Sequence, residues 1–450
     1  MRRRDLLKVG GLAALGACTR GGRIQVPSTR ARRLLDRAAW GPRPGDVERL
    51  AELGEDAWLD EQLHPDRIDD FDCDLRTAFI DAWNAPADLA FEIRPEHVER
   101  QLAAYTLTRA VYSERQLYEV MVAFWSDHFH VAIAKNECKH LALLHVRDAI
   151  RPHVFSPFRD LLRAATLSPA MLVYLDGRSN TAAAPNENHA RELLELHTLG
   201  VDGGYTQKDV MEAARCLTGW RVRERWAPGQ LAFEPAEHAP GTKNVLGRRI
   251  VQTERDEVDA LLDAIVAHPS CARFVARKLA RFFVSDDPPD ALVDEAARAF
   301  GSEGNTRAAM RVLLRSEELH AETKIKRPFR YVVSALRALD ADCSFGRRGT
   351  LTHLRAMGQT PFGYPTPDGY PQEGRAWLGT LNARWRYAWE LTHDALPDSS
   401  LMLDRWIERA GGAEAAWEVL IGRGPRGDER NLRGADSLAL ALATPEFQRA

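Results

Sequence analysis

The sequence lacks the short motifs that identify most hydrolytic, phosphoryl-transfer and dinucleotide-binding enzymes. It has no GxSxG, no HExxH, no Walker motif and no Rossmann fingerprint after a strand pattern. A CxxCH sequence is also missing, which argues against covalently attached c-type haem. No single motif therefore assigns an enzyme class, and function has to be inferred from residue patterns.

The chain also has no excess of basic charge. Its 61 Lys and Arg residues face 64 Asp and Glu residues, for a net charge of −3. The two signs are interspersed, as on solvated helix faces, and basic residues do not alternate with aromatic ones as single-stranded nucleic acid requires. With 450 residues, 45% of them hydrophobic, the chain can build a substantial core. We expect a globular protein that does not bind nucleic acid.

Cysteines are few and widely separated. No two have zinc-site spacing, and the five besides Cys18 are an odd number, which does not suit a disulfide framework. Cys216 and Cys271 lie in apolar helical contexts and are expected to be buried free thiols. The six cysteines are Cys18, Cys73, Cys138, Cys216, Cys271 and Cys343.

The first residues resemble an export and lipidation signal. Arg3 and Arg4 begin the run RRDLLK, which resembles the twin-arginine export motif. The apolar run at 9–17 is too short to cross a membrane as a helix. It ends in LGAC, which resembles a lipobox with Cys18 as the lipidated residue. A coincidental basic amphipathic start is the alternative.

We therefore expect a twin-arginine lipoprotein signal at 1–18 and a tether at 19–29. Thr19 follows the cysteine, so no Asp retention signal is present, which favours the outer membrane or its periplasmic face. The lipid anchor would join the protein to the cell-envelope membrane. Proteins exported by this route are often folded and loaded with a cofactor beforehand, which hints at a cofactor here.

After the tether, the pattern predicts an all-α fold. We expect one large multi-helix domain over 30–450 with a small β-hairpin insertion near 221–251, where short alternating runs with Gly and Pro replace the helical period. The stretch at 45–65 is predicted as one amphipathic helix, and 95–134 as one long helix or two abutting ones.

The stretch NENHARELLELHTLG, residues 186–200, predicts a helix with an unusual charged face. At 100° per residue, polar and apolar residues fall on two separate, continuous arcs. Asn186 is expected to cap the helix. The face is either a solvated surface or the wall of an active site. Its members are Glu187, Asn188, Arg191, Glu192 and Glu195.

We interpret that face as a site. Glu192 and Glu195 are three residues apart, so both can reach one divalent metal, although the Glu-x-x-His pair of di-iron bundles is missing. Arg191 would stabilise an anionic group of the substrate. Glu187 and Asn188 would contribute to cofactor binding.

The stretch YEVMVAFWSDHFHV, residues 118–131, supplies a further candidate ligand. His128 falls in the middle of an apolar helix face and is expected to be buried, whereas His130 falls on the opposite side and is expected to be exposed. A buried imidazole needs a backbone carbonyl, a carboxylate or a metal as partner. We assign His128 to the metal of Glu192 and Glu195, while non-covalent haem on His128 stays open.

Several other residues have two interpretations. His238, five residues before Lys243 in FEPAEHAPGTKNVLG, is either a surface histidine or a proton donor that completes the site. His197 is expected to be a core histidine, and Asp176 a turn residue. The loop MGQTPFGYPTPDGYPQEG at 357–374 is rich in aromatic and turn residues, a type of loop that often carries function.

These segments together resemble the bacterial domain-of-unknown-function 1800 family. The resemblance rests on FWSDHFHV, YLDG, the long NENHARELLELHTLGVDGGYTQKDVMEAARCLTGW, FEPAEHAPGTKNVLG, IKRPFRYVVSALRAL, MGQTPFGYPTPDGYP and LALATPEFQ. It covers nearly all of the chain after the signal. It implies a secreted, mainly helical protein, whose gene often neighbours one for a secreted protein resembling sulfatases and alkaline phosphatases.

From these patterns we expect an exported, lipid-anchored envelope protein, with a metal-dependent hydrolase of an extracellular or periplasmic substrate as first hypothesis. His128, Arg191, Glu192, Glu195 and His238 would be its catalytic residues. The alternatives are an iron- or copper-dependent oxidoreductase and a non-catalytic envelope scaffold that works with the sulfatase-like protein.

Overall fold

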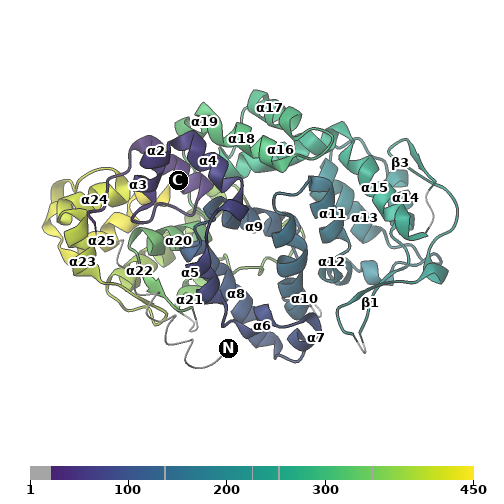
Figure 1. Ribbon diagram of the computed structural model, residues 1–450, viewed down its shortest axis with the longest axis horizontal. Coiled ribbons are helices and arrows are strands. Elements are labelled where there is room, and N and C mark those ends of the chain that lie inside the picture. Colours follow the sequence, from purple (N-terminus) through teal and green to yellow (C-terminus); the bar gives the residue numbers. More distant parts are fainter. Residues whose placement is uncertain (1–21, 136–137, 225–226, 252–253, 346–348) are drawn as a thin grey trace.

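The computed structural model describes residues 22–135, 138–224, 227–251, 254–345 and 349–450, and most of them are helical (Figure 1). The predicted all-α fold with a small β-hairpin insertion is confirmed. None of the described helices is long and apolar enough to span a membrane. The twin-arginine run, the lipobox and Cys18 lie outside the described residues.

The first third of the chain forms short helices around two longer ones. Gly54 has a φ of +79° and breaks the stretch at 45–65 into two helices, so the prediction of one helix there is wrong. Between 95 and 134 two helices form, and the second ends at His128. The elements are α2 (Thr29–Ala38), α3 (Asp46–Leu53), α4 (Glu55–Gln62), η2 (Pro65–Arg67), α5 (Phe71–Thr77), α6 (Asp81–Asn84), α7 (Ala87–Ala90), α8 (Pro95–Tyr112) and α9 (Gln116–His128).

Two π-helical turns interrupt the helices of the middle third. They extend α10 and α13, and a π turn rotates the side chains that follow it relative to a regular helix. The predicted cap of Asn186 on α13 is confirmed, and Thr206 and Asp209 form a capping box on α14. The elements are α10 (Cys138–Leu144), η3 (His145–Ile150), η4 (Arg151–His153), α11 (Phe158–Thr166), α12 (Pro169–Tyr174), η5 (Gly177–Ser179), α13 (Glu187–Leu194), η6 (Glu195–Leu199) and α14 (Gln207–Cys216).

Short antiparallel strands occupy the insertion. Trp220 pairs with Phe233 in one hairpin, and Val245 pairs with Arg248 across the tight turn of the other. A third pair joins segments that are far apart in sequence. The elements are β1 (Trp220–Val222), β2 (Leu231–Phe233), η7 (Pro235–Glu237), β3 (Lys243–Val245), β4 (Arg248–Ile250), β5 (Asp342–Cys343) and β6 (Ser399–Ser400).

The rest of the chain returns to helices. α16, α17 and α18 pack against one another, and α22 packs along α25. The elements are η8 (Glu254–Asp256), α15 (Glu257–Val266), α16 (Pro269–Phe283), α17 (Asp290–Phe300), α18 (Thr306–Arg315), α19 (Glu317–Ala321), α20 (Pro328–Ala338), α21 (Gly349–Ala356), η9 (Gly374–Thr380), α22 (Leu381–Thr392), α23 (Leu403–Ala410), α24 (Ala413–Ile421), η10 (Gly427–Asn431), α25 (Gly434–Ala443) and α26 (Pro445–Gln448).

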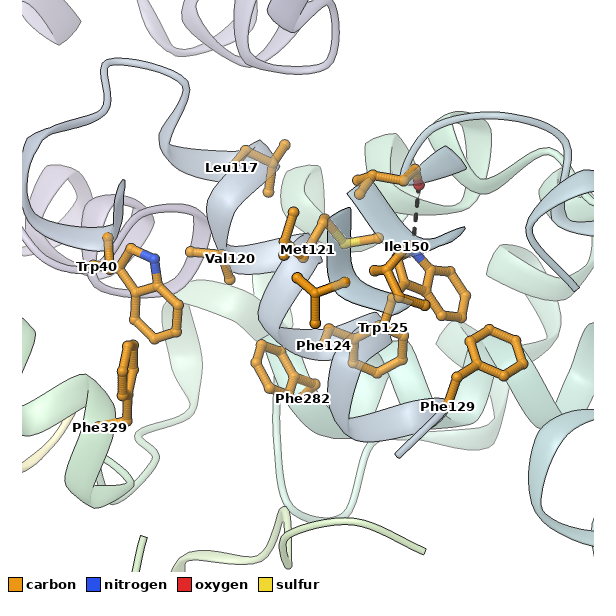
Figure 2. Close-up of a cluster of buried hydrophobic side chains, with 14 of the residues drawn as sticks. Trp40, Leu117, Val120, Met121, Phe124, Trp125, Phe129, Ile150, Phe282 and Phe329 are labelled. Atoms are coloured by element: carbon orange, nitrogen blue, oxygen red, sulfur yellow. Dashed lines mark hydrogen bonds between the residues drawn. The ribbon is translucent and has the colours of Figure 1, made fainter. Parts of the chain in front are cut away.

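A continuous hydrophobic cluster runs through the described chain from Ile24 to Phe447. Helix α9 lies near the middle of the molecule in Figure 1, between the helices of both termini and the group α11–α15. Figure 2 shows its apolar side chains packed on neighbouring elements, and the Trp125 indole donates to the Val154 carbonyl at 3.2 Å. Each large apolar side chain buried here contributes about 1.5–3 kcal/mol of transfer free energy, so the end of α9 has a rigid base.

The described cysteines agree with the sequence prediction. Cys73, Cys138, Cys216, Cys271 and Cys343 are all buried, and none of them forms a disulfide within the described residues.

Candidate functional site

Segments far apart in the sequence meet at the C-terminal end of α9. The His130 Nε2 donates to the Tyr364 carbonyl at 2.8 Å, and the Tyr174 hydroxyl donates to the Pro365 carbonyl at 3.0 Å. Both carbonyls belong to the loop at 357–373, between α21 and η9. The FWSDHFHV, YLDG and MGQTPFGYP segments are therefore fastened together.

A glycine brings this loop against the helix. Gly369 has a φ of +72°, and a Cβ atom added there would lie 2.2 Å from the main-chain oxygen of Asp127. No other residue fits without a shift of the loop or of α9. This close approach places the neighbouring Asp368 beside the end of α9.

Lys278 of α16 points its charge into the same region. Its half-buried ammonium makes no hydrogen bond or ion pair with any residue that the structure describes, and it lies 5.6 Å from the centre of the Phe274 ring. Burial lowers the pKa of Lys278 to about 8, and the attraction of Asp127 and Asp368 limits the fall. An unpaired lysine with this pKa is poised to change protonation near neutral pH.

The two aspartates differ in how strongly they are already engaged. Asp127 Oδ2 accepts a hydrogen bond from Arg327 Nη1 at 2.8 Å, in an ion pair whose side chains are both mostly buried. Asp368 is exposed, and its carboxylate accepts from the hydroxyl of Thr366 within the same loop. Asp368 is therefore the carboxylate with room for a ligand.

Glu192 of α13 belongs to the same electrostatic group. Burial raises the pKa of this half-buried carboxyl, and repulsion from Glu195 and Asp368 adds to the rise, while Arg191 opposes it. Asp368 thus acts on both Glu192 and Lys278. We call Lys278, Asp127, Glu192 and Asp368 the Lys278 cluster.

Neutral histidines lie behind the cluster. His128 is buried as predicted, and its Nε2 donates to the His197 carbonyl at 3.0 Å. Burial, with the nearby positive charge of Lys278, keeps the pKa of both His128 and His197 well below the ordinary value. Neither His128 Nδ1 nor His197 Nε2 has a partner among the described residues.

The prediction that His130 is exposed is wrong. Its side chain is fully buried because α9 ends at His128, so the helical wheel does not extend to residue 130, and because the loop at 357–373 covers it.

The outer part of the α13 face lies outside the cluster. Glu187 Oε2 accepts from Arg191 at 3.1 Å and from Gln207 on α14 in an exposed network. The Asn188 amide donates to the Leu175 carbonyl at 3.1 Å, which fastens α13 to the end of α12. Glu195 accepts a long hydrogen bond, 3.4 Å, from the Tyr205 hydroxyl.

His238 lies in a separate network in the insertion. Its Nε2 is 3.1 Å from Glu257 Oε2, and Lys243 Nζ is 2.6 Å from the same oxygen. The Thr218 hydroxyl lies 3.2 Å from His238 Nδ1 but donates to the Arg215 carbonyl. This buried network joins β3 to α15, and the structure does not bring His238 to the Lys278 cluster.

The three predicted metal ligands do not form one site in the described chain. Within its ranges, no group of three or more His, Cys, Asp and Glu side chains could hold a metal ion. The charges that act on His128 come from Lys278 and His197, not from Glu192 or Glu195. A metal with fewer protein ligands stays a prediction.

A cavity of about 60 Å³ adjoins the cluster at Asp127. Besides Asp127 and Arg327 it is lined by Ser126 and Trp40, and the Ser126 hydroxyl and the Trp40 indole nitrogen are buried without a partner in the described chain. A buried donor left unpaired costs about 1–3 kcal/mol. The volume has room for water or for a small polar group that would satisfy these donors.

Sequence reasoning missed Lys278, although a signal was present. Cys271, Val275, Lys278 and Phe282 follow the i, i+4, i+7, i+11 spacing of one helix stripe, so a lysine stands among core residues. Asp368 and Asp127 gave no comparable signal, because their proximity depends on a loop more than 200 residues away from α9.

A family model described as "Protein of unknown function (DUF1800)" matches residues 33–449, and the chain belongs to this family. Neither the curated proteins nor the solved structures gave a match to the chain. The family membership agrees with the resemblance seen in the sequence, and it supplies no reaction.

Proposed function

We propose that this chain is an exported, lipid-anchored hydrolase of the cell envelope whose acid–base groups are in the Lys278 cluster. The observation that carries the proposal is the convergence of distant family segments on one unpaired lysine. Titratable groups with shifted pKa values that gather beside a cavity are typical of active sites, because catalysis needs protonation states that water alone would not favour.

The cluster supplies the groups that ester hydrolysis requires. Water attacks the carbonyl carbon and gives its proton to the Glu192 carboxylate, whose raised pKa makes it a better base than an ordinary glutamate. The Lys278 ammonium binds the negative oxygen that forms, and the half-buried position strengthens this attraction. Glu192 then returns the proton to the departing alkoxide. The charge of Asp368 favours the protonated form of Lys278.

The substrate would be an ester or a polymer outside the cytoplasm, as the predicted export signal requires. The cavity beside Asp127 would take a small group of that substrate, with Ser126 and Trp40 as hydrogen-bond donors. A sulfatase-like envelope protein is the proposed partner, on the basis of the family resemblance alone.

A divalent metal remains part of the proposal in a restricted form. Burial raises the pKa of Glu192 and repulsion from Glu195 and Asp368 adds to the rise, so a cation bound beside Glu192 by fewer than three protein ligands would offset that repulsion. Elemental analysis of protein purified without an affinity metal tests this. One stoichiometric metal that is lost in Glu192→Gln supports it, and metal-free active protein rules it out.

One observation favours the second candidate, an iron- or copper-dependent oxidoreductase. The unpaired nitrogens of His128 and His197 are neutral and buried, the form in which imidazole binds transition metals. A stoichiometric iron or copper that disappears in His197→Ala would favour this candidate over the hydrolase.

The hydrolase is tested with a panel of chromogenic carboxylic, phosphate and sulfate esters. Lys278→Met and Asp368→Asn should lose most activity on any ester that the wild type cleaves, and activity should fall above about pH 8 as Lys278 loses its proton. Lys208→Met, at an exposed lysine of α14, is the matched control. Full activity in Lys278→Met would overturn the proposal.

A further inference from the structure

Helix α22 and the preceding η9 present an apolar face to solvent. Leu378, Leu381, Trp385 and Trp389 are 54%, 42%, 49% and 50% exposed. Positions 381, 385 and 389 are four apart, so they line one side of the helix, and 378 precedes them by three. We call these four residues the α22 face.

The exposure of these four side chains does not come from loose packing of α22. Arg384, Tyr387, Ala388 and Leu391 are buried on the adjoining side of α22. The packing of α22 on the rest of the protein therefore does not depend on the four residues of the α22 face. Exposed apolar residues are common singly, but four large ones on one stripe mark a surface that binds something.

The chemistry of the α22 face suits a membrane interface. Between Gly374 and Trp389 the sequence GRAWLGTLNARWRYAW has no acidic residue. Arg375 and Arg386 are exposed at its sides, each paired with a flanking glutamate. Trp and Leu on one helix face bordered by Arg are typical of helices that lie in the headgroup region.

The start of the described chain and the C-terminal end of α22 lie at the two ends of α23. Gly22 accepts from Arg409 Nε at 3.3 Å, and the Ile24 amide donates to the Arg409 carbonyl at 2.9 Å, at the end of α23. The other end of α23 follows Leu401, whose amide donates to Asp394 just beyond α22. The eight residues of α23 span about 12 Å. Both helices lie at the same end of the molecule in Figure 1.

A lipid on Cys18 would be four residues from Gly22, so the bilayer surface would lie within about 14 Å of it. We propose that the α22 face inserts into the phospholipid headgroup region and sets the orientation of the protein on the membrane. The inference rests on the proposed lipid anchor, because the anchor is the reason to name a membrane as the partner of the α22 face. It goes beyond anchoring, because a lipid anchor alone does not specify which surface of the protein enters the membrane.

Tryptophan fluorescence tests the inference directly, since Trp385 and Trp389 are the exposed tryptophans of the described chain. The mature full chain is added to phosphatidylethanolamine–phosphatidylglycerol vesicles whose acyl chains are either brominated or ordinary. Brominated chains quench tryptophans that reach the headgroup region. We expect quenching in the wild type and its loss in Leu378→Asp/Leu381→Asp, which keeps both tryptophans.

The matched control is Met211→Asp, a change of an apolar residue that is 50% exposed on α14, at the opposite end of the molecule from α22 in Figure 1, and it should leave quenching intact. Vesicle flotation separates the two proposals. Flotation without quenching overturns the inference and leaves the anchor. Quenching of a chain that carries no lipid supports the inference and shows that insertion of the α22 face does not depend on the anchor. Unquenched tryptophans buried in a dimer would also overturn it.

Discussion

At the scale of single residues, Lys278 is the clearest departure from what stability alone would favour. A charged amine with a pKa near 8 binds its proton less tightly in the folded chain than in the unfolded one, so its charge destabilises the fold at neutral pH. Residues that oppose stability in this way are characteristic of functional sites.

We predict that Lys278→Met raises the free energy of unfolding at pH 7, by about 1 kcal/mol or more. The gain should shrink as pH rises from about 8 toward 10.5, because the folded wild type loses its proton first and its own stability then increases. Urea unfolding of both proteins across this range measures it. A variant that is less stable at pH 7 would show that Lys278 is a structural residue.

Glu119 illustrates the opposite case, a buried charge that stabilises the fold. It accepts from Arg109 at 3.0 Å and from Arg151 at 2.6 Å. Burial alone would raise the pKa of Glu119, but the two arginines outweigh it and lower the pKa to about 2.

We expect Glu119→Gln to cost about 3–5 kcal/mol at pH 7, because it leaves the buried Arg151 without its carboxylate and removes one of the carboxylates that pair with Arg109. The stabilisation by Glu119 is complete above about pH 4.5 and is lost as pH falls toward 2. Glu187→Gln, in the exposed pair with Arg191, should cost about 0–1 kcal/mol. Thermal melts at several pH values compare the two, and equal costs would refute the difference.

At the scale of elements, the loop at 357–373 decides whether the site exists. Gly369 is the position where it approaches α9 most closely, and the Ile133 amide donates to the Phe362 carbonyl at 3.1 Å to hold it there. Without this docking, Asp368 would not face Lys278 or Glu192.

Gly369→Ala should displace the loop. Its new Cβ meets Asp127 at 2.2 Å in addition to the strain of a positive φ, whereas Gly358 has a similar φ of +79° and open space around it. We expect Gly358→Ala to cost about 1 kcal/mol and Gly369→Ala about 1–3 kcal/mol more. Faster hydrogen exchange at the Ile133 amide in Gly369→Ala alone would report the displacement. Identical behaviour of the two variants would contradict it.

The helices and the insertion could be predicted from the sequence, whereas breaks and ends of helices were harder to place. Helical periodicity predicted most helices, the insertion and the Asn186 cap, because these depend on neighbours in the chain. It missed the break at Gly54, where a positive φ interrupts an otherwise helical pattern. It also extended the helical wheel past His128, where α9 ends, so it misplaced His130.

The Lys278 cluster itself could not be derived from periodicity. Its members come from α9, α13, α16 and the loop at 357–373, and nothing in their local sequence fixes their separation. Only Glu192 was among the predicted site residues.

At the scale of the whole molecule, the two ends of the described chain are built into one core. The amide of Lys324 donates to the Ala450 carbonyl at 3.1 Å, and the Ala450 amide donates back at 2.7 Å. Lys326 forms a buried ion pair with Asp36 of α2 at 3.0 Å. The segment before α20 thus contacts both α2 and the C-terminal residue. Arg327, in the same segment, forms an ion pair with Asp127 of α9.

The proposed location is tested on the whole protein in its envelope. We expect the wild type in the membrane fraction, Cys18→Ser in the soluble exported fraction, and Arg3→Lys/Arg4→Lys retained in the cytoplasm. Cell fractionation with immunoblotting measures all three. If the Cys18→Ser variant stays in the membrane fraction, another surface, such as the α22 face, holds the protein on the membrane.

The most direct test of the central claim is the pKa of Lys278 in the folded protein. Competitive acetylation across pH, with mass spectrometry to resolve each lysine, gives the protonation midpoint of every amine. The account predicts a midpoint near 8 for Lys278 that falls further in Asp368→Asn, because an attractive carboxylate has been removed. A midpoint near 10.4, as in ordinary lysines, would contradict the account of the site.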